Sequence, residues 1–199
     1  MNESSKSKVW FDAAQRSVLK GRVLDIGAGS DPVTAGAVVF DLPQGDANHI
    51  TAFAPESFDC VYSSHCLEHM HDPEKTLANW WSLVAPGGCL FFIVPDEDLY
   101  EQGVFPSRFN GDHKSTFTLA KKRSWSSRSF NVLALCAALP GGRWLVGLPG
   151  NPLAACAALL TLVRPLLEGL RGQGLVPTVT ATLATAEPGR PGDGHRLLP

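Results

Sequence analysis

The 199 residues are enough for one domain, or for one domain with a fragment of a second. The chain is 44% hydrophobic and 18% charged, which is typical of a soluble protein that buries a core. A net charge of −2 at pH 7 provides no basic excess, so we expect no nucleic-acid partner.

The cysteines and the apolar runs indicate the compartment. The five cysteines form no CxxC pair, which predicts reduced, mostly buried thiols in a cytoplasmic protein. Residues 1–8 are polar, unlike a secretory signal. The longest apolar run, 153–163, is too short to span a bilayer. We therefore expect a cytoplasmic location and no membrane partner.

The composition changes part-way along the chain. No lysine follows Lys122, and Trp144 is the only aromatic residue after Asn131. Alanine, leucine, glycine and proline dominate from there on. This change predicts two domains, 1–131 and 132–199.

The first predicted element is a helix over residues 8–20, which have the apolar spacing of an amphipathic helix. Its apolar side would carry Trp10, Ala14, Val18 and Leu19. We expect this helix to pack on a sheet or to cover a ligand site.

Two strands follow in close succession. The apolar run 22–26 predicts a buried parallel strand, and 37–40 predicts a second one. Only the ten residues 27–36 separate the two strands, and a parallel crossover usually needs a dozen or more. At most one helical turn fits there, with Asp31 as its N-cap and Pro32 at its first position.

An acid and two glycines mark the end of the first strand. Asp25 is followed by Gly27 and Gly29, and glycines let a backbone come close to a ligand. Ligands of open α/β sheets lie outside the carboxyl ends of the strands, so this turn predicts a nucleoside-cofactor site. Asp41 ends the second strand, where it could accept hydrogen bonds from both ribose hydroxyls or simply be a strand-end acid.

The middle of the chain continues the α/β pattern. Residues 58–64 predict another parallel strand. A helix is expected over 73–84, because Asp72 suits the N-cap and a proline follows it. A strand over 89–94 comes next, and the long polar stretch 100–122 predicts a lid or binding loop.

The segment after the 58–64 strand matches the HxxEH pattern of inverted zinc proteases, with His65, Glu68 and His69. That chemistry needs one helix carrying both histidines and a distant third ligand. Here a strand precedes the segment and a new helix begins just after it. We therefore predict no metal site, but a loop at the cofactor in which His65 faces the ligand and Glu68 fixes the loop through hydrogen bonds.

Two further groups of polar residues are candidates. The acidic run 96–98 is either a solvated loop or part of the substrate entry, since it follows a strand. His113 lies in the predicted lid and could act as a general base.

Together these motifs resemble the class I S-adenosylmethionine-dependent methyltransferases of the small-molecule, type 11 sort, over about residues 20–122. The resemblance also rests on an FDxVxSxHxLEH pattern over 58–69 and a PGGxLxxxxP pattern over 86–95. It implies an α/β fold with a compact Rossmann-like sheet, mostly parallel, and a C-terminal strand-helix appendage. The last two strands of the family are not matched, so an incomplete sheet stays open as an alternative.

The resemblance also implies S-adenosylmethionine as cofactor and a set of residues that bind it. In chain order these are Asp25, Gly27, Gly29, Asp41, Asp46, Ala47 and Ser64. The first three would hold the methionine end, Asp41 the ribose, the next two the adenine, and the last would lie under the methionine arm.

The last part of the chain, about 139–199, resembles a fragment of the molybdopterin molybdenumtransferase family. The resemblance rests on the GLPGNP loop at 147–152, in which Asn151 could cap a helix with Pro152 at its first position. Most of that family's active site is absent. A packing role of this turn is the alternative to molybdopterin binding.

The predicted function is methyl transfer from S-adenosylmethionine to an unidentified small-molecule acceptor, by in-line displacement at the sulfonium. His65 and His113 are the candidate catalytic residues. Two alternatives stay open: a molybdopterin-binding module of molybdenum-cofactor biosynthesis, and a non-catalytic fusion remnant.

Overall fold

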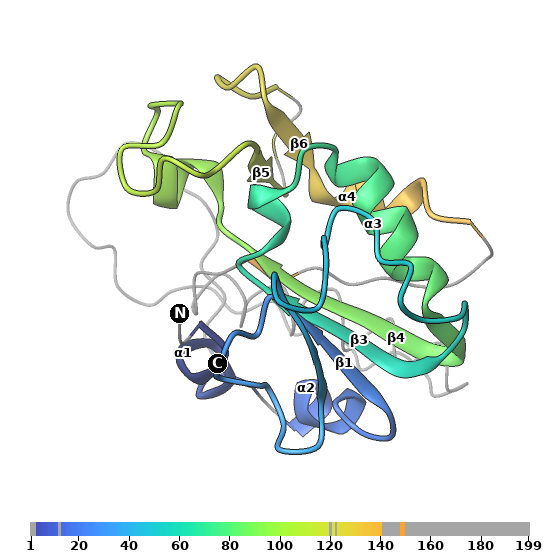
Figure 1. The fold of residues 1–199 in the computed structure, drawn as a ribbon. Helices are drawn as coiled ribbons and strands as arrows, with labels where there is room; N and C mark the ends of the chain where they lie inside the picture. The colour runs from blue at the N-terminus through green and yellow to red at the C-terminus, as the bar shows by residue number, and fades with distance from the viewer. Residues whose placement is uncertain (1–2, 12, 120, 122, 141–147, 150–199) are drawn as a thin grey trace, which may run out of the picture. The chain divides into compact units, whose positions relative to one another are not determined.

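The computed structural model describes residues 3–11, 13–119, 121, 123–140 and 148–149 (Figure 1). The chain divides into two compact units, 1–155 and 156–199, and the second lies outside the described residues. No helix within the described ranges is long and apolar enough to cross a membrane.

Within the part of the chain that the structure describes, five parallel strands form the central sheet. Their order is β2-β1-β3-β4-β7, with bounds β1 (Val23–Ile26), β2 (Val38–Phe40), β3 (Phe58–Ser64), β4 (Val84–Val94) and β7 (Leu148–Pro149). The sheet confirms the prediction of a Rossmann-like α/β fold with a mostly parallel sheet. Leu148 and Pro149 of the predicted appendage pair with the end of β4 and form the fifth strand of the sheet.

The order of the strands creates a switch point. The chain leaves β1 toward β2 on one side and returns to β3 on the other side of β1. Ile26, the last residue of β1, pairs with Phe40 of β2 and with Ser63 of β3. The segments that follow these three strands therefore meet at one edge of the sheet, which is where such folds bind ligands.

Side chains alternate between the two faces of the sheet and build two cores. On one face Leu24, Val61 and Phe92 pack with Trp80 of helix α3 (Pro73–Ser82), while on the other face Tyr62 packs with residues of the N-terminal segment. Figure 1 shows α3 and the short N-terminal helices on opposite sides of the sheet. This alternation of buried side chains is the two-residue period of a β-strand that is covered on both faces.

Helix α3 begins as the sequence predicts. The Asp72 side chain accepts a hydrogen bond from the backbone N–H of Lys75, and a proline occupies the first turn. The helix ends at Ser82 and β4 starts at Val84, so the predicted bounds of 84 for the helix and 89 for the strand are wrong. The stretch from Val84 to the glycines pairs with the start of β3 through a register shift.

The predicted helix over 8–20 is wrong. The chain forms two short helices, α1 (Glu3–Lys8) and α2 (Ala13–Val18). Between them Trp10 is 67% exposed, whereas Phe11 is buried with its ring centroid 5.1 Å from that of Phe91. The apolar spacing misled the prediction because Phe11, not Trp10, is the residue that docks on the sheet.

The turn between β1 and β2 contains no helix. Asp31, expected as an N-cap, instead accepts hydrogen bonds from the backbone N–H and the Oγ of Ser5, at 2.6 and 2.5 Å. Its carboxylate thus ties this turn to α1, so the prediction of a helical turn begun by Asp31 is wrong.

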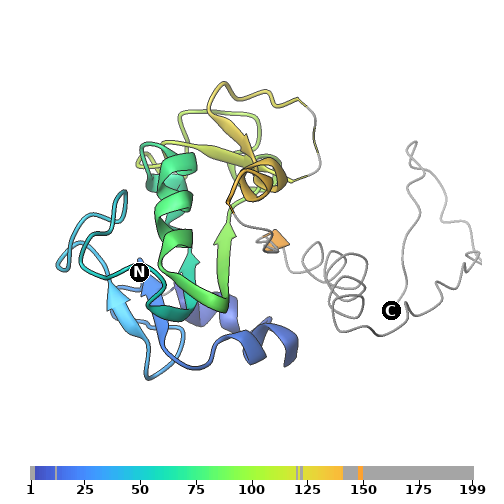
Figure 2. The ribbon, with the colours of Figure 1, turned by 90° about the vertical axis from the view of Figure 1, so that its right-hand side faces the viewer.

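The segment after β4, where the sequence predicts a lid or binding loop, contains regular secondary structure. It contains η2 (Glu97–Glu101), β5 (Thr116–Thr118), β6 (Ser129–Asn131) and α4 (Val132–Ala137), and β5 and β6 pair in parallel. In both views the β5–β6 pair and α4 lie beside α3 (Figure 1 and Figure 2). Phe117 of β5 is 1% exposed and belongs to the main core, so part of the predicted binding loop is structural.

Candidate functional site

The glycine turn after β1 depends on backbone conformations that suit glycine. Gly27 has φ +80° and Gly29 has φ +57°, and the N–H of Gly27 donates to the carbonyl oxygen of Phe40 at 2.9 Å. A Cβ atom on Gly27 would lie 2.9 Å from the Cβ and Sγ of Cys66. The turn therefore lies directly against the loop that follows β3.

Replacing Gly27 with alanine is expected to destabilise the chain more than the same change at Gly87. Both glycines have nearly the same φ, +80° and +79°, but only the Cβ at position 27 would meet other atoms within 4 Å. The left-handed backbone costs both variants about 1–2 kcal/mol, and overpacking against Cys66 adds about 1–3 kcal/mol in Gly27→Ala. Chemical denaturation measures the difference, and equal losses would contradict the close approach.

Asp25 is a buried carboxyl with a hydrogen bond to only one of its two oxygens. It is 1% exposed, and its Oδ2 accepts a hydrogen bond from the backbone N–H of Val33 at 2.6 Å. Among the described residues its Oδ1 has no hydrogen-bond partner. Burial raises the pKa of Asp25 to about 7, against the opposing effect of the Val33 hydrogen bond; Asp31 and Asp41 raise it slightly and Lys8 lowers it slightly. A cationic ligand group would relieve this unfavourable burial of charge.

Asp41 lies beside the glycine turn. Its Oδ2 accepts a hydrogen bond from the N–H of Gly29 at 2.7 Å, and its Oδ1 accepts one from Leu42 at 2.7 Å. A carboxylate offers about four lone-pair positions, so both oxygens can accept further hydrogen bonds. The carboxylate is partly exposed at the ligand edge of the sheet.

The predicted adenine residues are held in a fixed loop. Both nitrogens of Asn48 donate to Oδ1 of Asp46 at 2.8 Å, and these bonds lower the pKa of Asp46. The carbonyl oxygen of Ala47 accepts a hydrogen bond from the indole of Trp80 at 2.9 Å. Ser64 lies elsewhere, at the end of β3, where its Oγ is 3.1 Å from the Oγ of Ser7. The structure therefore keeps Asp46 and Ala47 together against α3, and Ser64 beside α1.

His65 begins the loop after β3 in a left-handed conformation, with φ +52°. Such outliers in non-glycine residues cluster at functional sites. Its N–H donates to Ile93 at 3.0 Å, and its Nδ1 is 3.4 Å from an oxygen of Glu68. The loop continues into η1 (Leu67–His69), where Glu68 is fully buried.

Glu68 holds the loop through hydrogen bonds of its backbone. Neither oxygen of its carboxylate is hydrogen-bonded among the described residues. Its backbone carbonyl instead accepts hydrogen bonds from Lys114 and Ser115, at 2.8 and 3.2 Å. These two bonds bring the segment around His113 next to η1.

His113 is buried and has a carboxylate partner that the sequence did not reveal. Its Nδ1 lies 2.6 Å from Oε1 of Glu101, and the side chains are 3% and 2% exposed. The rings of His69 and Tyr100 both lie 5.0 Å from the His113 ring, between centroids. Glu101 had no signal in the sequence, because it stands alone in a polar segment. The structure thus brings His113 near the loop of His65 but inside a polar cluster.

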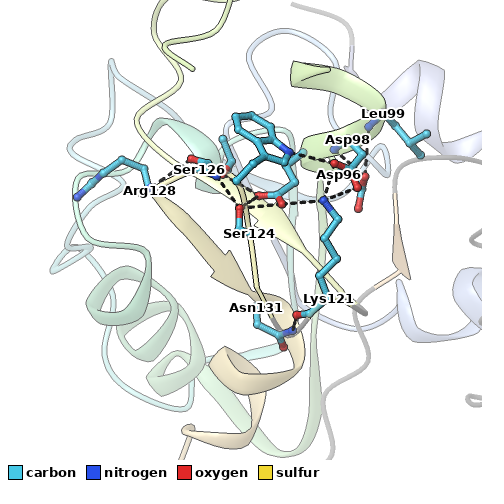
Figure 3. A network of polar contacts seen from close by, with 11 residues as sticks. Asp96, Asp98, Leu99, Lys121, Ser124, Ser126, Arg128 and Asn131 are labelled. Carbon is cyan, nitrogen blue, oxygen red and sulfur yellow. Dashed lines mark hydrogen bonds and ion pairs between the residues drawn. The ribbon is translucent and has the colours of Figure 1, made fainter. Parts of the chain in front are cut away.

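The acidic run after β4 is not simply solvated. Glu97 is fully buried, and its carboxylate accepts hydrogen bonds from Ser124 at 2.7 and 2.8 Å and from Thr116 and Lys121 at 3.1 Å each. Figure 3 shows Lys121 reaching toward Asp98, an exposed residue with which it forms a second ion pair. The network fastens Lys121 and Ser124 to the start of η2.

A family model described as a methyltransferase domain matches residues 7–131. The chain belongs to this methyltransferase family. The match contains the glycine turn, the 58–69 segment and the segment of His113, and confirms the class I prediction at the level of the family. The methyltransferase match does not extend to the molybdopterin-like stretch, which lies outside the described residues except for 139–140 and 148–149.

Solved methyltransferase structures resemble this methyltransferase domain. One is an S-adenosylmethionine-dependent methyltransferase of Thermotoga maritima, a possible histamine N-methyltransferase, with 20% identity and a TM-score of 0.35 over 49% of this chain and 52% of that one. Another is a putative methyltransferase of Bacillus halodurans, with 24% identity and a TM-score of 0.38 over 52% and 55%. The chain spans about half the length of these structures. No curated protein matches it.

Proposed function

We propose that this methyltransferase domain binds S-adenosylmethionine at the carboxyl edge of β1, β2 and β3 and transfers its methyl group to a small-molecule acceptor. The observation that carries the proposal is Asp25, whose buried Oδ1 lacks a partner beside a glycine turn at the switch point of the sheet. The cofactor carries an ammonium and a sulfonium, and either positive charge would favour the ionised form of this carboxyl.

The positions of the side chains support the proposed cofactor contacts. Asp25 and the turn of Gly27 and Gly29 would face the methionine end, and Asp41 would accept hydrogen bonds from the ribose. We assign the adenine to the Asp46–Ala47 loop, which hydrogen bonds hold against α3. Ser64, at the end of β3, would lie under the methionine arm. Within the family, these residues favour the small-molecule, type 11 sort of domain, and we expect it to work in the cytoplasm.

The chemistry asks little of the chain beyond positioning. The sulfonium is already activated, so holding the acceptor in line with the methyl–sulfur bond supplies most of the acceleration. A proton acceptor is needed only if the methylated atom carries a proton. We assign that role to His65, which is a quarter exposed and has the Glu68 carboxylate 3.4 Å from its Nδ1. The His113 side chain is too buried to contact an acceptor directly. We propose that it supports the same side of the site without touching the acceptor.

Calorimetric titration with S-adenosylhomocysteine tests the cofactor contact of Asp41. The Asp41→Asn variant removes a charged acceptor, and hydrogen bonds to charged groups contribute about 1.5–3 kcal/mol. We therefore expect a dissociation constant roughly 10- to 100-fold higher than that of the unmodified chain. Glu74→Gln is the matched control, because it removes one negative charge at an exposed position of α3.

Failure of the unmodified, folded chain to bind S-adenosylhomocysteine would refute the proposal. Equal affinities of Asp41→Asn and Glu74→Gln would refute the ribose contact while leaving the family membership untouched.

A further inference from the structure

A cluster of buried polar side chains lies outside the proposed cofactor contacts. Glu68 is 0% exposed, and neither of its carboxylate oxygens has a hydrogen-bond partner among the described residues. His69 and His113 each offer a ring nitrogen. These two nitrogens and one carboxylate oxygen of Glu68 all lie within 4.8 Å of one another. Two imidazoles and a carboxylate are a common donor set for first-row transition metals.

Each of the two imidazoles is oriented by a second carboxylate. The Nδ1 of His113 is 2.6 Å from Glu101, and the Nδ1 of His69 is 2.9 Å from Oδ2 of Asp112. Both interactions use Nδ1, which leaves Nε2 as the ring nitrogen for a metal. Histidines that bind metals typically donate their other ring N–H to a carboxylate or carbonyl in this way.

The charge of the cluster also favours a cation. Glu68 and Glu101 are both buried, and burying a carboxylate without compensation is costly. The imidazole of His65 is 3.4 Å from Glu68, and it carries a charge only when protonated. Lys114 pairs with the exposed Asp112 on the outer side of the cluster. A divalent ion would neutralise Glu68 without requiring protonated histidines.

The backbone holds the cluster together. The carbonyl oxygen of Glu68 accepts hydrogen bonds from Lys114 and Ser115, so the segment that carries His113 is fastened to the segment that carries Glu68 and His69. Metal sites need such support, because ligands from distant segments must keep a precise geometry.

We propose that Glu68, His69 and His113 form a binding site for a first-row divalent metal ion of the zinc or iron(II) class. The prediction of no metal site considered His65 and His69 as the pair of histidines, whereas the proposed site pairs His69 with His113 and takes Glu68 as its third ligand. Three protein ligands leave positions open for an oxygen of a bound molecule. The role of the ion rests on the proposed function: an acceptor that reaches the ion from the side of the partly exposed His69 would be favoured if it carries a metal-binding hydroxyl or carboxylate oxygen.

Titration of the untagged, chelator-treated chain with Co²⁺ tests the site itself. We expect one equivalent of Co²⁺ with visible d–d absorption, which Zn²⁺ displaces. His113→Gln and His69→Gln should lose the stoichiometric binding, whereas His71→Gln, an exposed histidine, should keep it. Asp112→Asn should weaken binding by about 10- to 100-fold, because its carboxylate orients His69. Far-UV circular dichroism establishes that each variant is folded, and His69, which is 20% exposed, is the change that disturbs the core least.

Two results would overturn the metal site: absence of stoichiometric Co²⁺ binding by the folded chain, or binding that His69→Gln and His113→Gln leave unchanged. Calorimetry with S-adenosylhomocysteine in the presence of a chelator separates the two proposals. Cofactor binding without Co²⁺ binding would refute the metal site alone, and Co²⁺ binding without cofactor binding would refute the proposed function alone.

Discussion

The ligand-free Asp25→Asn variant is expected to gain stability relative to the unmodified chain as the pH rises from 5 to 8. The same change is expected to abolish binding of S-adenosylhomocysteine. Burial raises the pKa of Asp25 to about 7, so the folded chain resists ionisation of this carboxyl. The same carboxyl in the unfolded chain ionises near 3.8. The favourable contribution of Asp25 to the free energy of unfolding is therefore fully present only below about pH 4. This contribution is lost as the pH rises toward 7.

The size of the effect follows from the two pKa values. The interval from 3.8 to about 7, at about 1.4 kcal/mol per pH unit, sets an upper bound of about 4 kcal/mol on the change between pH 4 and pH 8. Asp25→Asn cannot ionise, so its melting temperature should rise relative to that of the unmodified chain across this interval. Glu74→Gln, at an exposed acid, should follow the unmodified chain at both pH values. A difference between Asp25→Asn and the unmodified chain that is independent of pH would contradict the raised pKa.

Removal of the Glu97 carboxylate should be among the most destabilising single changes. Burial alone would raise the pKa of Glu97, but the hydroxyls and the Lys121 ammonium around it hold the pKa below its ordinary value. In Glu97→Ala the buried ends of these donors lose their acceptor. Breaking a buried ion pair from one side costs about 3–5 kcal/mol, which corresponds to a fall of roughly 6–20 °C in melting temperature for a chain of this size.

The exposed neighbour of Glu97 provides the control. Asp98 also pairs with Lys121, but its side chain is 48% exposed, and such pairs contribute at most about 1 kcal/mol. Hydrogen exchange should accelerate in β5 and β6 in Glu97→Ala and stay unchanged in Asp98→Ala. Similar losses in the two variants would mean that the buried network does not hold this segment.

Much of the sheet could be predicted because its signals are local. The strand over 58–64 is bounded by turn residues and carries a run of apolar side chains, and β3 has those bounds. Asp72 with the following proline predicted the start of α3, because a cap depends only on its own first turn. The short gap between β1 and β2 excluded a full helix there for reasons of length alone.

The errors came from contacts between distant segments. Periodicity placed Trp10 in the core, but the core accepts Phe11, which reaches rings of β3 and β4. The sequence predicted Asp31 as a helix cap, but its carboxylate oxygens accept hydrogen bonds from Ser5 of α1. In each case tertiary contacts outweighed a local preference, and the local sequence does not predict the partner residue.

The candidate site was predictable at its glycine turn and not in its polar cluster. Asp25 and Gly27 are recognisable because a strand, an acid and a glycine turn are consecutive in the sequence. Glu101 and His113 stand apart in a polar segment, and only the fold pairs them and brings His113 beside Glu68. Residues 132–199 stay a predicted second domain, and the molybdopterin-like loop at 147–152 stays an expectation.

A crystal structure of the chain with S-adenosylhomocysteine tests the central claim most directly. The account predicts the homocysteine arm against Asp25 and Gly27, with both ribose hydroxyls donating to Asp41. A nucleoside bound away from the carboxyl ends of β1 and β2, or crystals without bound ligand at saturating concentration, would contradict it.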